Sequence, residues 1–200
     1  MPENQYVHGY SARESERLRD QAETLTELLH DDTRYPDGSR VLEAGCGIGA
    51  QTAILAKNSP GADITSLDIS SDSLQLAEEK IRSSGITNVT FRHGDIFDLP
   101  FERESFDHIF VCFVLEHLAD PSGALLHLRP LLREGGTLTV IEGDHGSTLF
   151  HPEDPDARRA IECLVELQER AGGNALIGRQ LYPLVAGRAS GSSGWKRVEP

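Results

Sequence analysis

The stretch RVLEAGCGIGAQTAILAK, residues 40–57, decides the fold that this chain predicts. A short apolar segment leads into Gly45, Gly47 and Gly49, at every second position, and a run with helical spacing follows. A loop in which every second residue lacks a Cβ can turn tightly and lets another group approach its backbone. We therefore expect a strand, a glycine loop that contacts a ligand, and a helix.

Strand patterns and helix patterns alternate along the rest of the chain. Strands are expected at 40–43, 62–68, 88–95, 109–115 and 137–143, and the fourth is an unbroken apolar run typical of a strand buried on both faces. Helices are expected at 11–30, 50–58, 71–85, 121–136 and 157–173, with a further helical segment from 176 that Pro183 disturbs. This alternation predicts an α/β fold with a doubly wound, mostly parallel sheet.

Two hundred residues suit one domain with a single core. We divide residues 1–200 into an N-terminal segment with a helix (1–35), a core that holds the glycine loop (40–143), an insert (144–187), and a linker with a sixth strand (188–200).

Composition excludes several classes of partner. The net charge of −13 argues against a surface that neutralises phosphates, so no nucleic-acid partner is expected. No apolar run approaches the roughly 20 residues of a membrane span, and the first residues lack the pattern of a signal peptide. Cys46, Cys112 and Cys163 have no metal-like spacing and cannot all pair. A cytoplasmic protein without membrane contact is expected.

The glycine loop alone leaves two nucleotide chemistries open. Gly45, Gly47 and Ala50 also satisfy the G-x-G-x-x-A form of the dinucleotide fingerprint, and Asp68 lies near the distance expected for a ribose-binding acid. A nicotinamide-dependent oxidoreductase is therefore one alternative.

Four motifs in order favour another reading. These are E-x-G-x-G-x-G from Glu43, LDIS at 67–70, HGDIFDLPF at 93–101 and FDHIFVCFVLEHL at 106–118. With them, residues 10–143 resemble the class I S-adenosylmethionine-dependent methyltransferases of the small-molecule type. The resemblance implies a Rossmann-like methyltransferase fold, S-adenosylmethionine as cofactor, and a small-molecule acceptor.

The resemblance also implies a set of residues around the nucleoside. Asp68 accepts hydrogen bonds from both ribose hydroxyls, and Asp95 accepts one from the adenine amino group. Ile69 and Ile96 enclose the ring. Simpler interpretations stay open, because Asp68 could only cap a helix, Asp95 could belong to a turn, and the two isoleucines could be ordinary core.

At the methionine end of the cofactor, the resemblance places backbone rather than side chains. The loop residues Gly45, Cys46 and Gly47 meet the methionine part, and Cys112 and Phe113 lie near its amino acid group. Glu43 sits beside the loop, where it would repel a pyrophosphate, or it is a structural acceptor. Tyr10 belongs to a lid over the methionine end, or to a frayed terminus.

Methyl transfer from a sulfonium depends mainly on alignment, and a base matters only if the acceptor must lose a proton. The candidate bases are His145 and His117. His145 lies in the insert 144–187, which is expected to form the acceptor side of the site. His117 could instead be only a residue at the start of a helix. Asp144, His145 and His151 could instead form a metal site, but we predict none, because proximity on a loop does not fix geometry.

The end of the chain departs from the family. Such folds normally finish with a sixth strand and an antiparallel seventh, but residues 194–200 supply at most the sixth. We expect an incomplete sheet edge, which a second copy of the chain could complete. A truncated, non-catalytic cofactor-binding module is therefore a further alternative.

Overall fold

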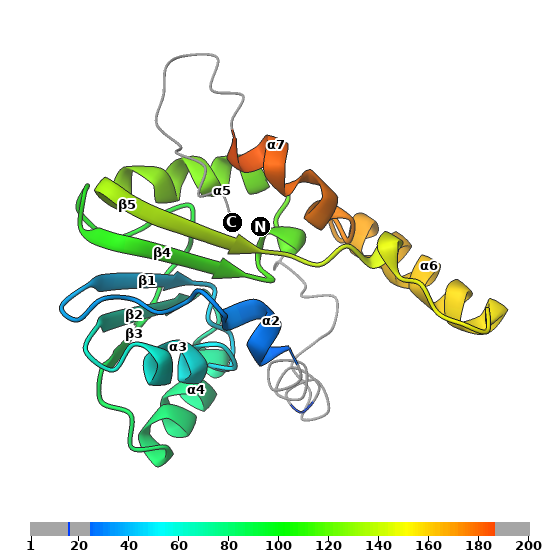
Figure 1. The fold of residues 1–200 in the computed structure, drawn as a ribbon. Coiled ribbons are helices and arrows are strands. Elements are labelled where there is room, and N and C mark those ends of the chain that lie inside the picture. Colours follow the sequence, from blue (N-terminus) through cyan, green and yellow to red (C-terminus); the bar gives the residue numbers. More distant parts are fainter. Residues whose placement is uncertain (1–15, 17–24, 187–200) are drawn as a thin grey trace.

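The computed structural model describes Glu16 and residues 25–186, and its centre is a five-stranded sheet of order β3-β2-β1-β4-β5 (Figure 1). All neighbouring strands pair in parallel. The strands are β1 (Arg40–Ala44), β2 (Asp63–Asp68), β3 (Val89–His93), β4 (Phe106–Cys112) and β5 (Leu132–Ile141). The predicted α/β fold with a parallel sheet is confirmed.

Helices cover both faces of this sheet, as a doubly wound fold requires. On one face lie α3 (Thr52–Asn58) and α4 (Ser71–Ser83), and on the other lie α5 (Pro121–Leu128) and α7 (Leu181–Val185) (Figure 1). A short helix, α2 (Thr26–His30), precedes β1, and α6 (Pro155–Arg170) follows β5. The expected helix at 11–30 lies mostly outside the described residues, as does the expected sixth strand.

Local sequence sets where these helices begin. The side chains of Ser70, Asp120 and Asp154 accept hydrogen bonds from amides in the first turns of α4, α5 and α6. Proline follows the last two of these caps, where its fixed φ suits the first helical position. At the other end of α4, Gly85 has a φ of +69°, which confirms it as the residue that closes this helix.

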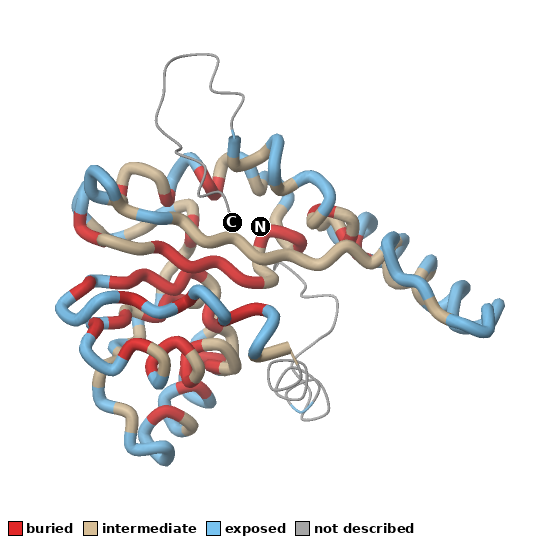
Figure 2. Tube along the Cα trace, viewed as in Figure 1, coloured by how far each residue is buried: buried red, intermediate tan, exposed pale blue. Residues whose placement is uncertain are grey.

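The core lies between the central strands and the helices on either face (Figure 2). Strands β1 and β4 are buried along most of their length, which explains their apolar sequences. One hydrophobic cluster joins β4 to α5 and the segment before α7, and a second joins β1 and β2 to α2 and α3.

Two strand predictions were wrong at their boundaries. The fourth strand was expected at 109–115, but β4 ends at Cys112, because Phe113 has a φ of +56° and residues Leu115–His117 form a 3-10 helix. The expected helix at 121–136 stops at Leu128, and β5 begins at Leu132 rather than at 137. A 3-10 turn containing Pro130 separates them, because proline cannot continue the helix.

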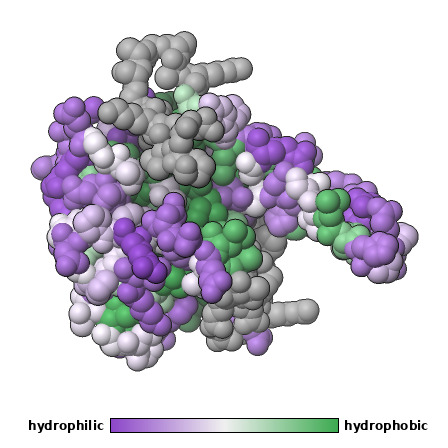
Figure 3. All heavy atoms as spheres, viewed as in Figure 1, coloured by the Kyte–Doolittle hydropathy of each residue, from purple (hydrophilic) through white to green (hydrophobic). Residues whose placement is uncertain are grey.

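The segment after β5 leaves the compact part of the molecule. Helix α6 extends away from the sheet and is exposed along most of its length (Figure 2). Figure 3 shows hydrophobic residues near the middle of the main body on this face. Within the part of the chain that the structure describes, no helix has the length and apolar character needed to cross a membrane.

Candidate cofactor and acceptor site

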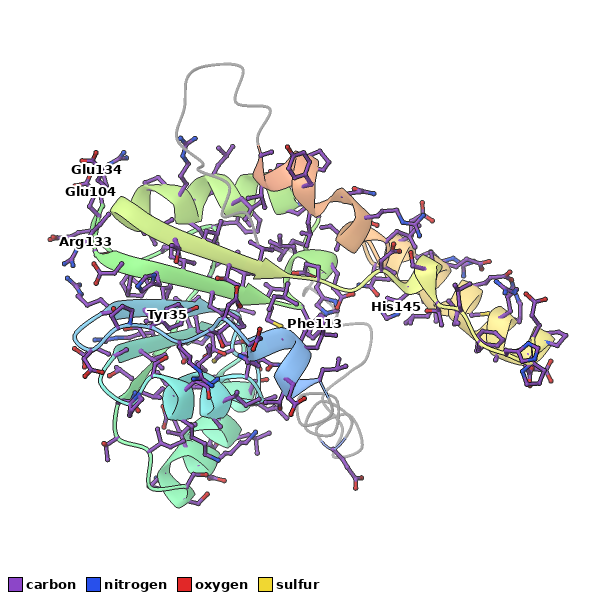
Figure 4. All side chains as sticks on the ribbon, viewed as in Figure 1. Tyr35, Glu104, Phe113, Arg133, Glu134 and His145 are labelled. Atoms are coloured by element: carbon purple, nitrogen blue, oxygen red, sulfur yellow. The ribbon has the colours of Figure 1, made fainter. Side chains whose placement is uncertain are left out.

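The candidate residues gather beyond the carboxyl ends of the strands. The strand order reverses between β1 and β4, and parallel sheets bind ligands outside the strand ends at such a switch point. Phe113 and His145 lie at this end, whereas Tyr35, Glu104 and Arg133 lie toward the other (Figure 4).

The backbone of the glycine loop is hydrogen-bonded to the neighbouring strand β2. The amides of Gly45 and Cys46 both donate to the carbonyl of Leu67 in β2, at 2.7 and 3.0 Å. Gly45, Gly47 and Gly49 all have positive φ, which disfavours any residue with a Cβ.

The three glycines have different neighbours. A Cβ on Gly45 would collide with the side chain of Val114, and one on Gly49 would lie 3.0 Å from the Cβ of Ala77 in α4. Apart from the chain neighbours of Gly47, no atom of the described residues lies within 4 Å of a Cβ placed there. The loop therefore needs Gly45 and Gly49 for packing, and its backbone at Gly47 is accessible to a ligand.

Asp68 joins the end of β2 to this loop. Its Oδ2 accepts from the Gly47 amide at 2.7 Å, and its Oδ1 accepts from the Ser70 amide at 2.9 Å. The carboxylate is thus held beside the accessible glycine, at the strand tip where the sequence predicts the ribose acceptor. Each oxygen of a carboxylate has two lone pairs, so both can accept a further hydrogen bond.

The predicted adenine residues follow β2 and β3. Ile69 is 55 % exposed, which is unusual for a large apolar side chain and suits a surface for a ring. Ile96 is 8 % exposed and belongs to the hydrophobic core. Asp95 forms a turn in which its Oδ1 accepts from the Phe97 amide at 2.9 Å.

Glu43 is buried under the loop and is held by hydroxyl groups. Its Oε2 accepts from Thr52 Oγ1 at 2.7 Å and from Ser66 Oγ at 2.6 Å. Burial raises the pKa of this carboxyl to about 7, although the two hydroxyls oppose the shift. Glu43 therefore ties β1 to β2 and α3 through side-chain hydroxyls.

The end of β4 supplies the next part of the site. Cys46 and Cys112 are both buried, and burial raises the pKa of each thiol, so neither is a ready nucleophile. The Phe113 amide donates to the Ile141 carbonyl at 2.9 Å, and its positive φ then turns the chain out of the sheet. A non-glycine residue in this conformation is strained, and such strain gathers at functional sites.

Sequence analysis missed two carboxylates at this end, Glu142 and Glu116. Glu142 accepts from the amides of Val114, Leu115 and Glu116 at 2.9, 2.7 and 3.3 Å. Burial raises the pKa of Glu142 to about 7, against the effect of these amides. An acid at the carboxyl end of an expected strand, as Glu43 is at the end of the strand expected at 40–43, was the signal that could have found Glu142.

Glu116 brings the two candidate bases together. Its Oε2 lies 3.6 Å from His145 Nε2, and its Oε1 lies 3.5 Å from His117 Nε2. His145 comes from the 3-10 turn after β5 (His145–Ser147), whereas His117 comes from the turn after β4. His117 and His145 are thus 28 positions apart in the sequence and meet at one carboxylate. The sequence signal for Glu116 was its place directly before the candidate base His117 in LEHL.

The metal alternative finds no support in the geometry. Asp144 accepts two hydrogen bonds from Arg179, at 2.9 and 2.8 Å, which lower the pKa of its carboxyl. Among the described residues, no group of three or more His, Cys, Asp or Glu side chains could hold a metal ion. Tyr10, the predicted lid residue, lies outside the described residues.

Comparison with known proteins identifies the family. A family model described as "Methyltransferase domain" matches residues 36–181. Methyltransferase GfsG of Streptomyces halstedii is 31 % identical over 126 residues, which are 62 % of this chain and 45 % of that protein. Demethylmenaquinone methyltransferase of Staphylococcus aureus is 35 % identical over 106 residues, 52 % of this chain and 43 % of that protein. The matches span less than half of these two relatives.

Solved structures agree on the fold. Phosphoethanolamine N-methyltransferase 2 of Haemonchus contortus, in complex with S-adenosyl-L-methionine, superposes with a TM-score of 0.61 at 21 % identity over 84 % of this chain and 36 % of that one. Coclaurine N-methyltransferase, bound to N-methylheliamine and S-adenosylhomocysteine, gives 0.54 at 25 % identity over 60 % of this chain and 35 % of that one.

The glycine loop fits the methyl donor of this family, because it leaves room at Gly47 and sets a carboxylate beside it. The chain belongs to the class I S-adenosylmethionine-dependent methyltransferases.

Proposed function

We propose that this chain transfers the methyl group of S-adenosylmethionine to a small-molecule acceptor that enters beside residues 144–186. The observation that carries the proposal is the loop at Gly47, where the backbone is accessible and the Asp68 carboxylate is fixed beside it. S-adenosylmethionine supplies an activated methyl group on a sulfonium.

The cofactor residues keep the roles that the sequence predicts. Asp68 accepts from the ribose hydroxyls with its remaining lone pairs, and Asp95 accepts from the adenine amino group through Oδ2. Ile69 covers one face of the adenine ring, and its exposure supports this role better than the burial of Ile96 supports the other face. The backbone at Gly45–Gly47 and at Cys112–Phe113 contacts the methionine part.

The reaction itself is an in-line displacement. A lone pair on the acceptor atom attacks the methyl carbon, the carbon–sulfur bond breaks, and its electron pair stays on sulfur as a thioether. The acceptor's proton passes to an imidazole, for which His145 and His117 are the candidates. Alignment can supply up to about 7 to 11 kcal/mol of the barrier, and a base adds about 100-fold to 10,000-fold.

Three observations support a small acceptor. The relative from Staphylococcus aureus is named for a small-molecule acceptor, demethylmenaquinone. The net charge of −13 disfavours a nucleic acid. The amides of Asn174 and Gly178 also donate to the carbonyls of Glu116 and Gly143, which brings residues 174–178 of the expected acceptor-side insert against the strand ends. A cytoplasmic location and assembly through the sheet edge stay predictions.

The test follows the methyl group. The protein is incubated with S-adenosylmethionine labelled in the methyl group and a small-molecule extract of the source organism, with boiled protein as control. Label that moves to a new compound in the small-molecule fraction supports the proposal. Label that moves only to added protein or RNA, or that stays on the cofactor while the protein binds it, contradicts the proposal.

A further inference from the structure

We propose that Glu116 is a positioning residue that holds His117 and His145 against one buried carboxylate, so that the two imidazoles act as a coupled pair on the acceptor side. The role of the histidines as bases rests on the proposed methyl transfer. The coupling between the two histidines is independent of that proposed function.

The carboxylate lies behind the imidazoles. The Glu116 side chain is 8 % exposed, whereas those of His117 and His145 are 20 % and 36 % exposed. Glu116 is therefore too deep to meet an acceptor directly, and the histidines lie between it and solvent. At 3.5 and 3.6 Å, the two contacts are close charge contacts rather than short hydrogen bonds.

The peptide unit that holds Glu116 is fixed from several sides. Its carbonyl accepts from the Asn174 amide at 2.7 Å and from Gln168 Nε2 at 2.9 Å. The same Gln168 amide group donates to Glu116 Oε2 at 3.2 Å, and Gln168 is completely buried. Glu142 accepts from the Glu116 amide on the other side. A carboxylate held this firmly can set the position of mobile partners.

The same contacts connect the pair to the glycine loop. Val114, two residues before Glu116, packs against Gly45, and Glu142 fixes the backbone from 114 to 116. His145 is anchored separately, because its amide donates to the Ala175 carbonyl at 3.0 Å. The backbone that carries Glu116 and His117 thus continues directly from the residue that packs on the glycine loop.

The negative charge of Glu116 faces both imidazoles. Burial raises the pKa of Glu116, but contact with His145, the charge of His117 and the Gln168 amide outweigh it, and its pKa is lowered overall. Glu142 faces the pair from the end of β5, and Cys112 lies near it as a thiol. Asp144 beside His145 is neutralised by Arg179.

A carboxylate that faces both Nε2 atoms favours the neutral tautomer with the proton on Nε2. We expect this tautomer in both rings, and a residue with only a packing role would not favour it.

The test is an NMR titration of the histidine ring resonances in the full chain without added ligand, with assignments from His117→Asn and His145→Asn. Glu116→Gln keeps the size of the side chain and removes its charge. We expect the midpoints of His117 and His145 to move to lower pH by about half a unit to one unit, because an opposite charge nearby favours the charged ring. His127 should not move, and Glu79→Gln, at an exposed site on α4, is the matched control.

A second variant covers the case in which Glu116→Gln does not fold. His117→Asn removes the competing cation, so the midpoint of His145 should rise, and nitrogen shifts should show its neutral ring protonated on Nε2. Unmoved midpoints in folded Glu116→Gln, or His145 unaffected by His117→Asn, would overturn the proposal. Failure to bind S-adenosylmethionine would instead contradict the methyltransferase function and leave the titration result standing.

Discussion

Replacing Gly47 with alanine separates a ligand site from a simple turn. Gly47 has a φ of +52°, and within the part of the chain that the structure describes an added Cβ meets nothing within 4 Å. The substitution costs about 1 to 2 kcal/mol of backbone strain, because alanine disfavours this conformation. For a domain of this size, about 1 kcal/mol lowers the melting temperature by roughly 2 to 4 °C. Gly47→Ala should therefore fold and melt about 2 to 8 °C below the wild type.

Cofactor binding should suffer more than folding. If the donor contacts the backbone at Gly47, the new methyl group occupies its space, and such overpacking costs about 1 to 3 kcal/mol. Affinity for S-adenosylhomocysteine should fall by about 5-fold to 150-fold in a calorimetric titration.

The chain provides a matched control for this experiment. Gly38, in the turn before β1, has a φ of +79° and the same empty surroundings, but it lies at the opposite end of that strand. Gly38→Ala should lose a similar amount of stability and bind S-adenosylhomocysteine like the wild type. Equal affinity in both variants would refute the reasoning, since the loop would then be only a turn.

Three other substitutions test separate parts of the account. Asp68→Asn should weaken S-adenosylhomocysteine binding by about 1.5 to 3 kcal/mol in the same titration, while Asp63→Asn, exposed at the start of β2, should not; equal affinities would remove Asp68 from the site. With the pKa of Glu43 raised to about 7, its contribution to stability is present below about pH 4.5 and lost as pH rises through 7. In urea unfolding, the stability of Glu43→Gln relative to the wild type should therefore rise by on the order of 3 kcal/mol between pH 5 and pH 8. A stability difference that does not change with pH would contradict the raised pKa of Glu43. Gly45→Ala should lower the melting temperature more than Gly47→Ala, because its Cβ meets the side chain packed above the loop; an equal loss would contradict that packing.

The parts of the fold that the sequence predicted depend on local patterns. Local patterns predict the glycine loop, the strand that ends at Asp68 and the helix that Gly85 closes. The spacing of apolar residues indicates the strand and the helix, and glycine is the residue that most readily adopts a positive φ. The alternation of strands and helices then fixed the parallel sheet. The end of β4 was predicted wrongly because Phe113 turns the chain out of the sheet where Glu142 accepts the following amides, a contact across 27 residues or more. The start of β5 was predicted wrongly because a 3-10 turn at Pro130 ends the preceding helix early.

The missing part of the site has the same cause. His117 and His145 were found separately as single residues of the right chemistry, and nothing in their spacing indicates that they meet. They meet because Glu116 is buried between two turns and is fixed by Gln168, 52 residues away. Contacts of this range arise from packing, which a pattern read along one chain does not contain.

The most direct test of the central claim is calorimetric titration of this chain with S-adenosylmethionine, S-adenosylhomocysteine and NADH. The account predicts saturable binding of both adenosyl compounds at one site per chain, and no binding of NADH. Binding of NADH alone, or no heat from either adenosyl compound with folded protein, would contradict it.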